Sequence, residues 1–116
     1  WLLPFWREPH AAPPCVKENR GSAAVLRSRD GGKTWKVYGE ITHPKTWLIE
    51  NTLVERSDGG VLMLFRTSLG VLFQSLSMDK GRTWQEPTPT GIPNPDSKVQ
   101  MARLMSGHLV LVFNAH

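Results

Sequence analysis

The chain has 116 residues, of which 40% are hydrophobic and 21% are charged, and its formal net charge is +4. This composition is too apolar for a disordered chain, and no apolar run reaches the roughly 18 residues that a membrane-spanning helix needs. The basic residues are scattered and no aromatic residues alternate with them, so nucleic-acid binding is not expected, whereas a small anionic ligand requires only a few well-placed arginines.

The termini and the single cysteine say little about the compartment. Cys15 has no partner for an intrachain disulfide. Residues 1–4, Trp-Leu-Leu-Pro, lack the charged region and long apolar stretch of a secretory signal peptide, and the sequence does not begin with Met. We therefore expect a segment of a longer protein, which is secreted or on the cell surface if that protein carries a signal peptide. No cofactor and no metal ion are expected.

Short apolar stretches rich in β-branched and aromatic residues alternate with clusters of Gly, Pro and Asp, which predicts strands joined by turns. In chain order the predicted strands are residues 2–6, 23–28, 35–41, 50–55, 61–66, 71–77, a strand from 84 onward, 98–104 and 108–113. Residues 87–96 contain four prolines and are expected to be a surface loop. Because no segment has a sustained 3.6-residue period, the predicted fold class is all-β.

One predicted strand differs from the others in its pattern. Residues 61–65, Val-Leu-Met-Leu-Phe, do not alternate between apolar and polar side chains. A continuous apolar run of this length between two turns is typical of a strand that is buried on both faces.

Two octets repeat the pattern Ser-x-Asp-x-Gly-x-Thr-Trp, at residues 28–35 and 77–84, which places them 49 residues apart. A repeat of about 50 residues that contains four short strands is the period of a propeller blade. The octet resembles the Asp-box, the turn between the third and fourth strands of a blade in sialidases and related propellers. The ten matching residues are Ser28, Asp30, Gly32, Thr34, Trp35, Ser77, Asp79, Gly81, Thr83 and Trp84.

The chemistry of the octet is structural. Asp30 and Asp79 are expected to accept backbone N–H bonds inside a tight turn, the Gly allows a positive φ, and the Trp covers the base of the hairpin. We therefore expect both aspartates to support folding and not to take part in catalysis or metal binding.

The register of the Asp-boxes assigns the strands to blades. Residues 1–41 contain the second, third and fourth strands of one blade, residues 49–87 form a complete blade, and residues 98–116 begin a third. The resemblance implies a six-bladed propeller, of which this chain supplies about two blades. A propeller closes only with all its blades, typically about 4–8, so the remaining blades are needed as partners.

In such a blade the Asp-box loops lie on one face, and the loops after the second and fourth strands lie on the other. The second face collects the candidate functional residues Arg7, Glu8, His10, Glu50, Arg66, Asn94, Asp96 and Asn114. Glu50 begins one predicted strand and Arg66 ends the next, so the two are expected to be neighbours. From the residues alone, a salt bridge at the rim, worth about 0–1 kcal/mol, remains an alternative to a functional role.

Residues 49–66, IENTLVERSDGGVLMLFR, are similar to a sialidase segment in which a Glu-Asn pair begins a strand and a later apolar strand ends in Arg. In that family the Glu activates the tyrosine nucleophile, and the Arg belongs to a triad that holds the sialic acid carboxylate. The resemblance implies these roles for Glu50 and Arg66. An Arg suits this task because its planar fork can bind a carboxylate through two hydrogen bonds.

Two further segments resemble parts of the same family. Residues 91–97 are similar to the loop after an Asp-box, and residues 111–115 are similar to the following strand, whose polar end borders the pocket. The resemblance implies that Asn94 and Asn114 contact substrate, and an ordinary turn role is the alternative for each. Tyr38, the only tyrosine, follows an Asp-box within a fourth strand and is expected to pack.

The sequence lacks other residues that a sialidase needs: the Arg of an Arg-Ile-Pro segment, the acid/base Asp that follows it, a third Arg and the Tyr nucleophile. The resemblance therefore implies a segment of a retaining exo-α-sialidase-like glycoside hydrolase acting on terminal sialic acid or a related acidic sugar, and the 116 residues alone are expected to be inactive. Two alternatives remain: a non-catalytic Asp-box propeller that binds glycan or protein, and a glycosidase or lyase of another acidic sugar.

Overall fold

The computed structural model describes residues 1–8 and 21–115. The expectations for His10 and Cys15 lie outside the described residues, as does residue 116. The described residues form β-strands and turns without a helix, so they include no helix that could span a membrane. The predicted all-β class is confirmed.

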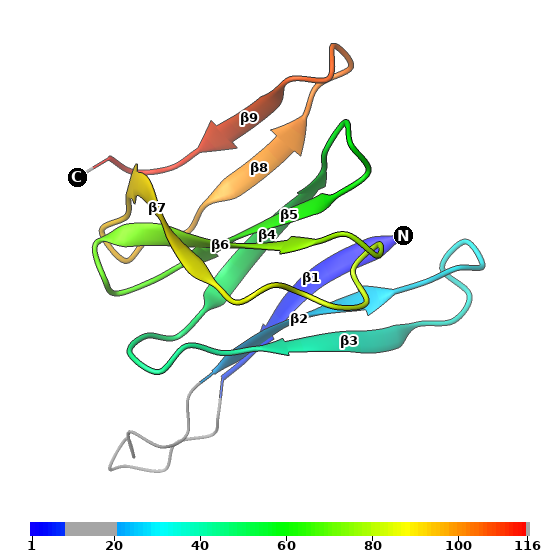
Figure 1. Ribbon diagram of the computed structural model, residues 1–116, viewed down its shortest axis with the longest axis horizontal. Helices are drawn as coiled ribbons and strands as arrows, with labels where there is room; N and C mark the ends of the chain where they lie inside the picture. The colour runs from blue at the N-terminus through cyan, green and yellow to red at the C-terminus, as the bar shows by residue number, and fades with distance from the viewer. Residues whose placement is uncertain (9–20, 116) are drawn as a thin grey trace.

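The strands form three successive antiparallel sheets of three, four and two strands, each following the order of the chain (Figure 1). Their bounds are β1 Leu2–Arg7, β2 Ser22–Arg27, β3 Lys36–Ile41, β4 Ile49–Glu55, β5 Val61–Arg66, β6 Val71–Ser77, β7 Thr88–Pro93, β8 Gln100–Arg103 and β9 Leu109–Val112. Every strand except β7 lies close to its predicted position.

The prediction for residues 87–96 was wrong, because β7 lies within the expected loop and does not begin at residue 84. β7 pairs with β6, with Pro89 opposite Phe73 and Pro93 opposite Val71. β7 is the edge strand of its sheet, and an edge strand tolerates proline because one of its sides needs no N–H donors. Two of the four prolines, Pro89 and Pro93, therefore lie in an edge strand, and the other two flank it.

The middle sheet has a hydrophobic cluster on each face. Met63 and Phe65 of β5 belong to a buried cluster with Val25 of β2, in the first sheet. Leu64, the residue between them, belongs to a second cluster with Met101 of β8, in the third sheet. Because successive side chains of a strand point to opposite faces, β5 is packed on both sides, as its continuous apolar run predicted.

The first Asp-box forms a hydrogen-bonded turn between β2 and β3. Asp30 accepts bonds from the backbone N–H of Thr34 at 2.9 Å and from the Thr34 hydroxyl at 2.6 Å. The Ser28 hydroxyl donates to Asp30 and accepts from the N–H of Gly32, both at 2.8 Å. These donors stabilise the ionised carboxylate and lower the pKa of Asp30 to about 2, with the Thr34 hydroxyl as the largest cause.

The second Asp-box repeats these bonds between β6 and β7. Asp79 accepts from the N–H and the hydroxyl of Thr83 at 2.8 and 2.6 Å, and Ser77 bridges Asp79 and Gly81. The Thr83 hydroxyl is again the largest cause that holds the pKa of the aspartate well below its usual value. The Trp84 indole donates to the Gly81 carbonyl at 3.2 Å and its ring packs against the first cluster.

Connections between strands gather at two ends of the molecule. In Figure 1 the β2–β3 and β6–β7 turns and the β4–β5 and β8–β9 hairpins lie toward the right, whereas the β3–β4 and β5–β6 connections lie toward the left. The first group contains both Asp-boxes, and we call this side the Asp-box end. We call the other side, where β4 begins and β5 ends, the opposite end.

Candidate functional site

Glu50 and Arg66 meet at the opposite end of the middle sheet. Ile49 pairs with Arg66 across β4 and β5, which brings the neighbouring Glu50 within reach of the guanidinium. Nη1 of Arg66 donates to Oε2 of Glu50 at 2.9 Å, and the exposed fractions of the two side chains are 25% and 22%. The pairing of two antiparallel strands thus accounts for the proximity expected from the sequence.

The backbone of Glu50 has an unusual conformation, with a φ of 47°. Register pairs on either side are Ile49 with Arg66 and Thr52 with Leu64, so two residues of β4 oppose only one residue of β5. Such a β-bulge bends its strand and changes the direction of a side chain. A non-glycine residue with positive φ costs about 1–2 kcal/mol, and strain of this kind concentrates at functional sites.

Asn51, the second residue of the bulge, points into the protein. It is buried, and its Nδ2 donates to the carbonyl of Ala24 at 3.3 Å and approaches Sδ of Met63 at 3.2 Å. Its Oδ1 is buried and has no hydrogen-bond partner among the described residues. Asn51 therefore links the bulge to the first sheet, while Glu50 faces Arg66.

A second carboxylate, that of Asp96, also binds Arg66. Nε of Arg66 donates to Oδ1 of Asp96 at 2.9 Å. Asp96 lies between β7 and β8, has a φ of 57°, and its side chain is 55% exposed. Arg66 is therefore held on one side by a half-buried carboxylate from its own hairpin and on another by an exposed carboxylate from a loop.

Asn94 supports the loop that carries Asp96. Its side chain is 1% exposed, its Oδ1 accepts from the N–H of Thr67 at 3.3 Å, and its Nδ2 donates to the carbonyl of Ser97 at 2.8 Å. The N–H of Asn94 also donates to the carbonyl of Gly70 at 2.9 Å. Asn94 thus ties the Asp96 loop to the segment that follows Arg66. Both ends of its amide are bound to the protein, and its expected contact with substrate stays a prediction.

The electrostatics of the site keep Arg66 charged. Hydrogen bonds to Asp96 and then to Glu50 raise the pKa of Arg66 above its already high ordinary value. A guanidinium has five N–H donors, and within residues 1–8 and 21–115 Arg66 uses one on Nε and one on Nη1. Both N–H groups of Nη2 and the second one of Nη1 have no acceptor within those two ranges, so they can donate to another group.

The other expected site residues do not join this group in the described part of the chain. Asn114 lies beyond β9 and is exposed. Glu8 accepts a bond from the indole of Trp6 at 2.7 Å, and the guanidinium of Arg7 lies 5.3 Å from the ring centre of Phe5. The structure places Tyr38 against the first hydrophobic cluster, as expected for a packing residue.

Sequence reasoning placed Asp96 on this face without finding its contact with Arg66. The contact depends on the left-handed backbone of Asp96 and on the loop geometry that Asn94 imposes, neither of which the sequence pattern reveals. The sequence placed Asp96 at the end of an expected surface loop, just before the predicted strand at residues 98–104. Among the described residues, no group of three or more His, Cys, Asp or Glu could hold a metal ion.

Comparisons with known proteins agree with this architecture. A family model described as a BNR repeat-like domain matches residues 1–116. A solved structure of a protein of unknown function from Dyadobacter fermentans has 25% sequence identity and a TM-score of 0.77, and the match covers 95% of this chain and 29% of that chain.

Two structures of the NanB sialidase from Streptococcus pneumoniae also match. A mutant of that enzyme has 28% identity and a TM-score of 0.63, covering 79% of this chain and 15% of that one. A complex of the enzyme with a substituted ethanesulfonate has 27% identity and a TM-score of 0.61, covering 78% and 15%. No curated protein matches the chain. The chain spans less than a third of these solved structures, and its fold is that of a propeller fragment of the sialidase type.

Proposed function

The chain belongs to the BNR repeat-like domain family, and from that membership we propose that the complete protein is a sialidase-like glycosidase acting on a terminal acidic sugar. The observation that carries the proposal is the exposure and the hydrogen bonding of the Arg66 guanidinium. Its guanidinium is partly exposed at the end of the sheet remote from the Asp-boxes, is oriented by two carboxylates and has N–H groups without an acceptor among the described residues. This arrangement suits the capture of a sugar carboxylate through two hydrogen bonds.

Glu50 has two roles in the proposal. Its bond to Nη1 orients the guanidinium of Arg66, which reduces the entropy that substrate binding would otherwise cost. The carboxylate would also accept the proton of a tyrosine hydroxyl contributed by another blade. A tyrosine with an ordinary pKa of about 10 is a weak nucleophile at neutral pH, and an adjacent base activates it.

The reaction would then follow the retaining course that tyrosine-dependent glycosidases use. The tyrosine oxygen attacks the anomeric carbon as the bond to the leaving oxygen breaks, and an acid from another blade of the propeller protonates that oxygen. Water releases the sugar in the second step. In this scheme Arg66 holds the substrate carboxylate throughout both steps.

Charge balance at the site favours a specific role for Asp96. Glu50, Arg66 and Asp96 together carry a formal charge of −1, which opposes an anionic ligand. Asp96 is more exposed than Glu50, with 55% against 22%, and comes from a loop. We therefore assign Asp96 as the carboxylate that releases its hydrogen bond to Nε of Arg66 when a substrate carboxylate binds.

The test is an activity assay of the full-length protein on three aryl glycosides, those of sialic acid, of glucuronic acid and of galactose. Turnover of the sialoside alone supports the proposal in its specific form, and turnover of the uronide identifies a glycosidase of another acidic sugar. Saturable binding of the acidic sugars without turnover identifies a non-catalytic glycan binder. Preferred turnover of the neutral galactoside contradicts the role proposed for Arg66.

A further inference from the structure

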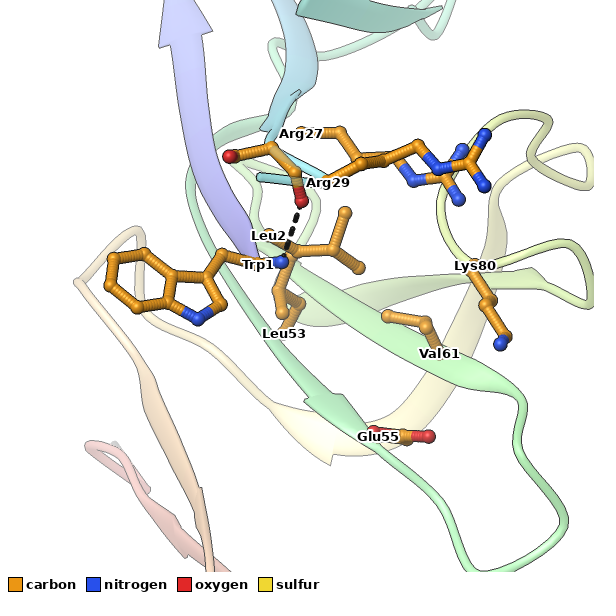
Figure 2. A pocket seen from close by; sticks show the side chains of 9 residues that line it. Trp1, Leu2, Arg27, Arg29, Leu53, Glu55, Val61 and Lys80 are labelled. Carbon is orange, nitrogen blue, oxygen red and sulfur yellow. Dashed lines mark hydrogen bonds between the residues drawn. The ribbon is translucent and has the colours of Figure 1, made fainter. Parts of the chain in front are cut away.

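A concave site lies at the Asp-box end, remote from Glu50 and Arg66. Its volume is about 460 Å³, and its lining residues are Trp1, Leu2, Arg27, Ser28, Arg29, Leu53, Glu55, Val61 and Lys80 (Figure 2). They come from the start of β1, the end of β2, β4, the start of β5 and both Asp-box turns. The pocket therefore lies between the first and second sheets, and we call it the inter-sheet pocket.

Among the described residues, three cations and one carboxylate line the inter-sheet pocket. The cations are Arg27, Arg29 and Lys80, and the carboxylate is that of Glu55. The ion pairs of the described residues involve Arg56 and Arg66, so the three pocket cations are not neutralised by a salt bridge within that part of the chain. In Figure 2 the side chains of Arg27 and Arg29 extend in the same direction, with Lys80 below them. The local charge is thus positive.

The Asp-boxes hold the backbone of two of these cations in place. Arg29 lies between Ser28 and Asp30, whose side chains are hydrogen-bonded at 2.8 Å. Lys80 follows Asp79 with a left-handed φ of 59°, inside a turn fixed by the bonds of Asp79 to Thr83. The anchoring of both backbones lowers the ordering cost of binding, because only the side chains remain to be immobilised.

The third cation, Arg27, is held by its surroundings. Its guanidinium lies 5.8 Å from the ring centre of Tyr38, a geometry in which the ring face attracts the charge. The wall beside the cations is apolar and consists of Leu2, Leu53 and Val61. The pocket thus combines a positive side with an apolar side within one small volume.

We propose that the inter-sheet pocket binds a small organic phosphate or sulfate monoester, independently of the site at Glu50 and Arg66. The oxygens of a tetrahedral anion can accept hydrogen bonds from several cations at once, and Arg groups bind such anions through paired N–H donors. The carbon skeleton of the ester covers Leu2, Leu53 and Val61. The Asp-box end then has a binding function in addition to its structural one.

The test measures binding to the full-length protein by isothermal titration calorimetry with 4-nitrophenyl phosphate, 4-nitrophenyl sulfate and the neutral 4-nitroanisole. We expect saturable binding of at least one ester and none of 4-nitroanisole, and the tighter ester identifies the anionic group. The variant Arg29→Gln/Lys80→Asn should weaken binding at least about tenfold, equivalent to about 1.4 kcal/mol. Asn is chosen at position 80 because it tolerates a left-handed backbone.

A matched control removes the same charge from the same two turns. Lys33 and Arg82 belong to the two Asp-boxes and do not line the pocket, so Lys33→Asn/Arg82→Gln should leave the affinity unchanged. Glu55→Gln should strengthen binding severalfold, since it removes the carboxylate of the pocket. The proposal is overturned if neither ester binds, if the control weakens binding as much as the pocket variant, or if Arg66→Ala abolishes it.

Discussion

Nε of Arg66 donates a hydrogen bond of 2.9 Å to Oδ1 of Asp96, a residue 30 positions later in the chain. In this position Asp96 occupies one edge of the guanidinium, as the carboxylate of a bound ligand would. Glu50 binds the same group through Nη1. The site is therefore organised around a cation that already has two carboxylate partners of unequal exposure.

Replacement of Arg66 should mainly affect substrates that carry a carboxylate. In the full-length protein we expect Arg66→Ala to lower kcat/KM for an acidic glycoside by about 10- to 150-fold, because a hydrogen bond to a charged group contributes about 1.5–3 kcal/mol. The kcat/KM of Arg66→Lys should lie between those of the unmodified protein and Arg66→Ala, since Lys keeps the positive charge but cannot form the paired hydrogen bonds of a guanidinium. An unchanged kcat/KM for the acidic glycoside in Arg66→Ala would remove the basis of the assignment.

Removal of the negative charge of Asp96 should favour acidic ligands. We expect Asp96→Asn to lower KM for an acidic glycoside severalfold with little change in kcat, because Asn keeps a hydrogen-bond acceptor for Nε and tolerates the φ of 57°. Steady-state kinetics of the full-length protein measure this effect. Asp58→Asn is the matched control, since Asp58 pairs with Arg56 in the hairpin at the other end of the same sheet. A KM that rises in Asp96→Asn would show that Asp96 assists binding.

The left-handed backbone of Glu50 gives a prediction about stability. Glu50→Gly and Glu50→Ala both remove the carboxylate, but glycine adopts a φ of 47° without steric cost. We therefore expect Glu50→Gly to have a free energy of unfolding about 1 kcal/mol higher than Glu50→Ala, as measured by urea denaturation.

Glu55, at the other end of the same strand, provides the control for this comparison. It lies outside the set of residues with positive φ, so Glu55→Gly should be less stable than Glu55→Ala by about 0.5–1 kcal/mol. Equal stabilities of Glu50→Gly and Glu50→Ala would contradict the inference that the bulge is strained.

Both Asp-box aspartates should make stability depend on pH in the acid range. The pKa of Asp30 falls from 3.8 to about 2 on folding, and the pKa of Asp79 is lowered as well. Between these values the unfolded chain binds more protons than the folded one, so the free energy of unfolding decreases as the pH falls. The contribution of Asp30 is fully present above about pH 4 and is lost as the pH falls through about 2.

Urea denaturation at a series of pH values measures this dependence. Asp30→Asn and Asp79→Asn should each lower stability at neutral pH and reduce the slope between about pH 4 and pH 2. Glu86→Gln is a suitable control because Glu86 is an exposed carboxylate after the second Asp-box. If the free energy of unfolding of both Asn variants depended on pH with the same slope as that of the unmodified protein, the Asp-boxes would be ruled out as the source of the pH dependence.

Local signals in the sequence were enough to predict most of the fold. The positions of β5 and β6 follow from apolar runs bounded by Gly-rich turns, and the repeated octets correctly indicated two equivalent turns. The position of β7 was not predicted, because proline normally interrupts strands and only the edge position makes it acceptable.

The site was predictable only where strand pairing determines it. Glu50 and Arg66 are brought together by the antiparallel register of β4 and β5, which the order of the strands implies. The bulge at Glu50, the burial of Asn94 and the bond from Arg66 to Asp96 depend on contacts between distant segments. Such contacts leave no periodic pattern in the sequence, so the supporting role of Asn94 became apparent only from the structure.

The two clusters that share β5 also have a consequence for synthesis on the ribosome, where chains emerge from the N-terminus. The first sheet and β4 are made before Met63 and Phe65, which fill the cluster between them. Leu64 is made before Met101 of β8, so the second cluster is complete only after β8 has been synthesised. Each sheet therefore emerges with an apolar face that only later residues can cover, and a pause in translation between β5 and β8 would leave that face open to aggregation or to a chaperone.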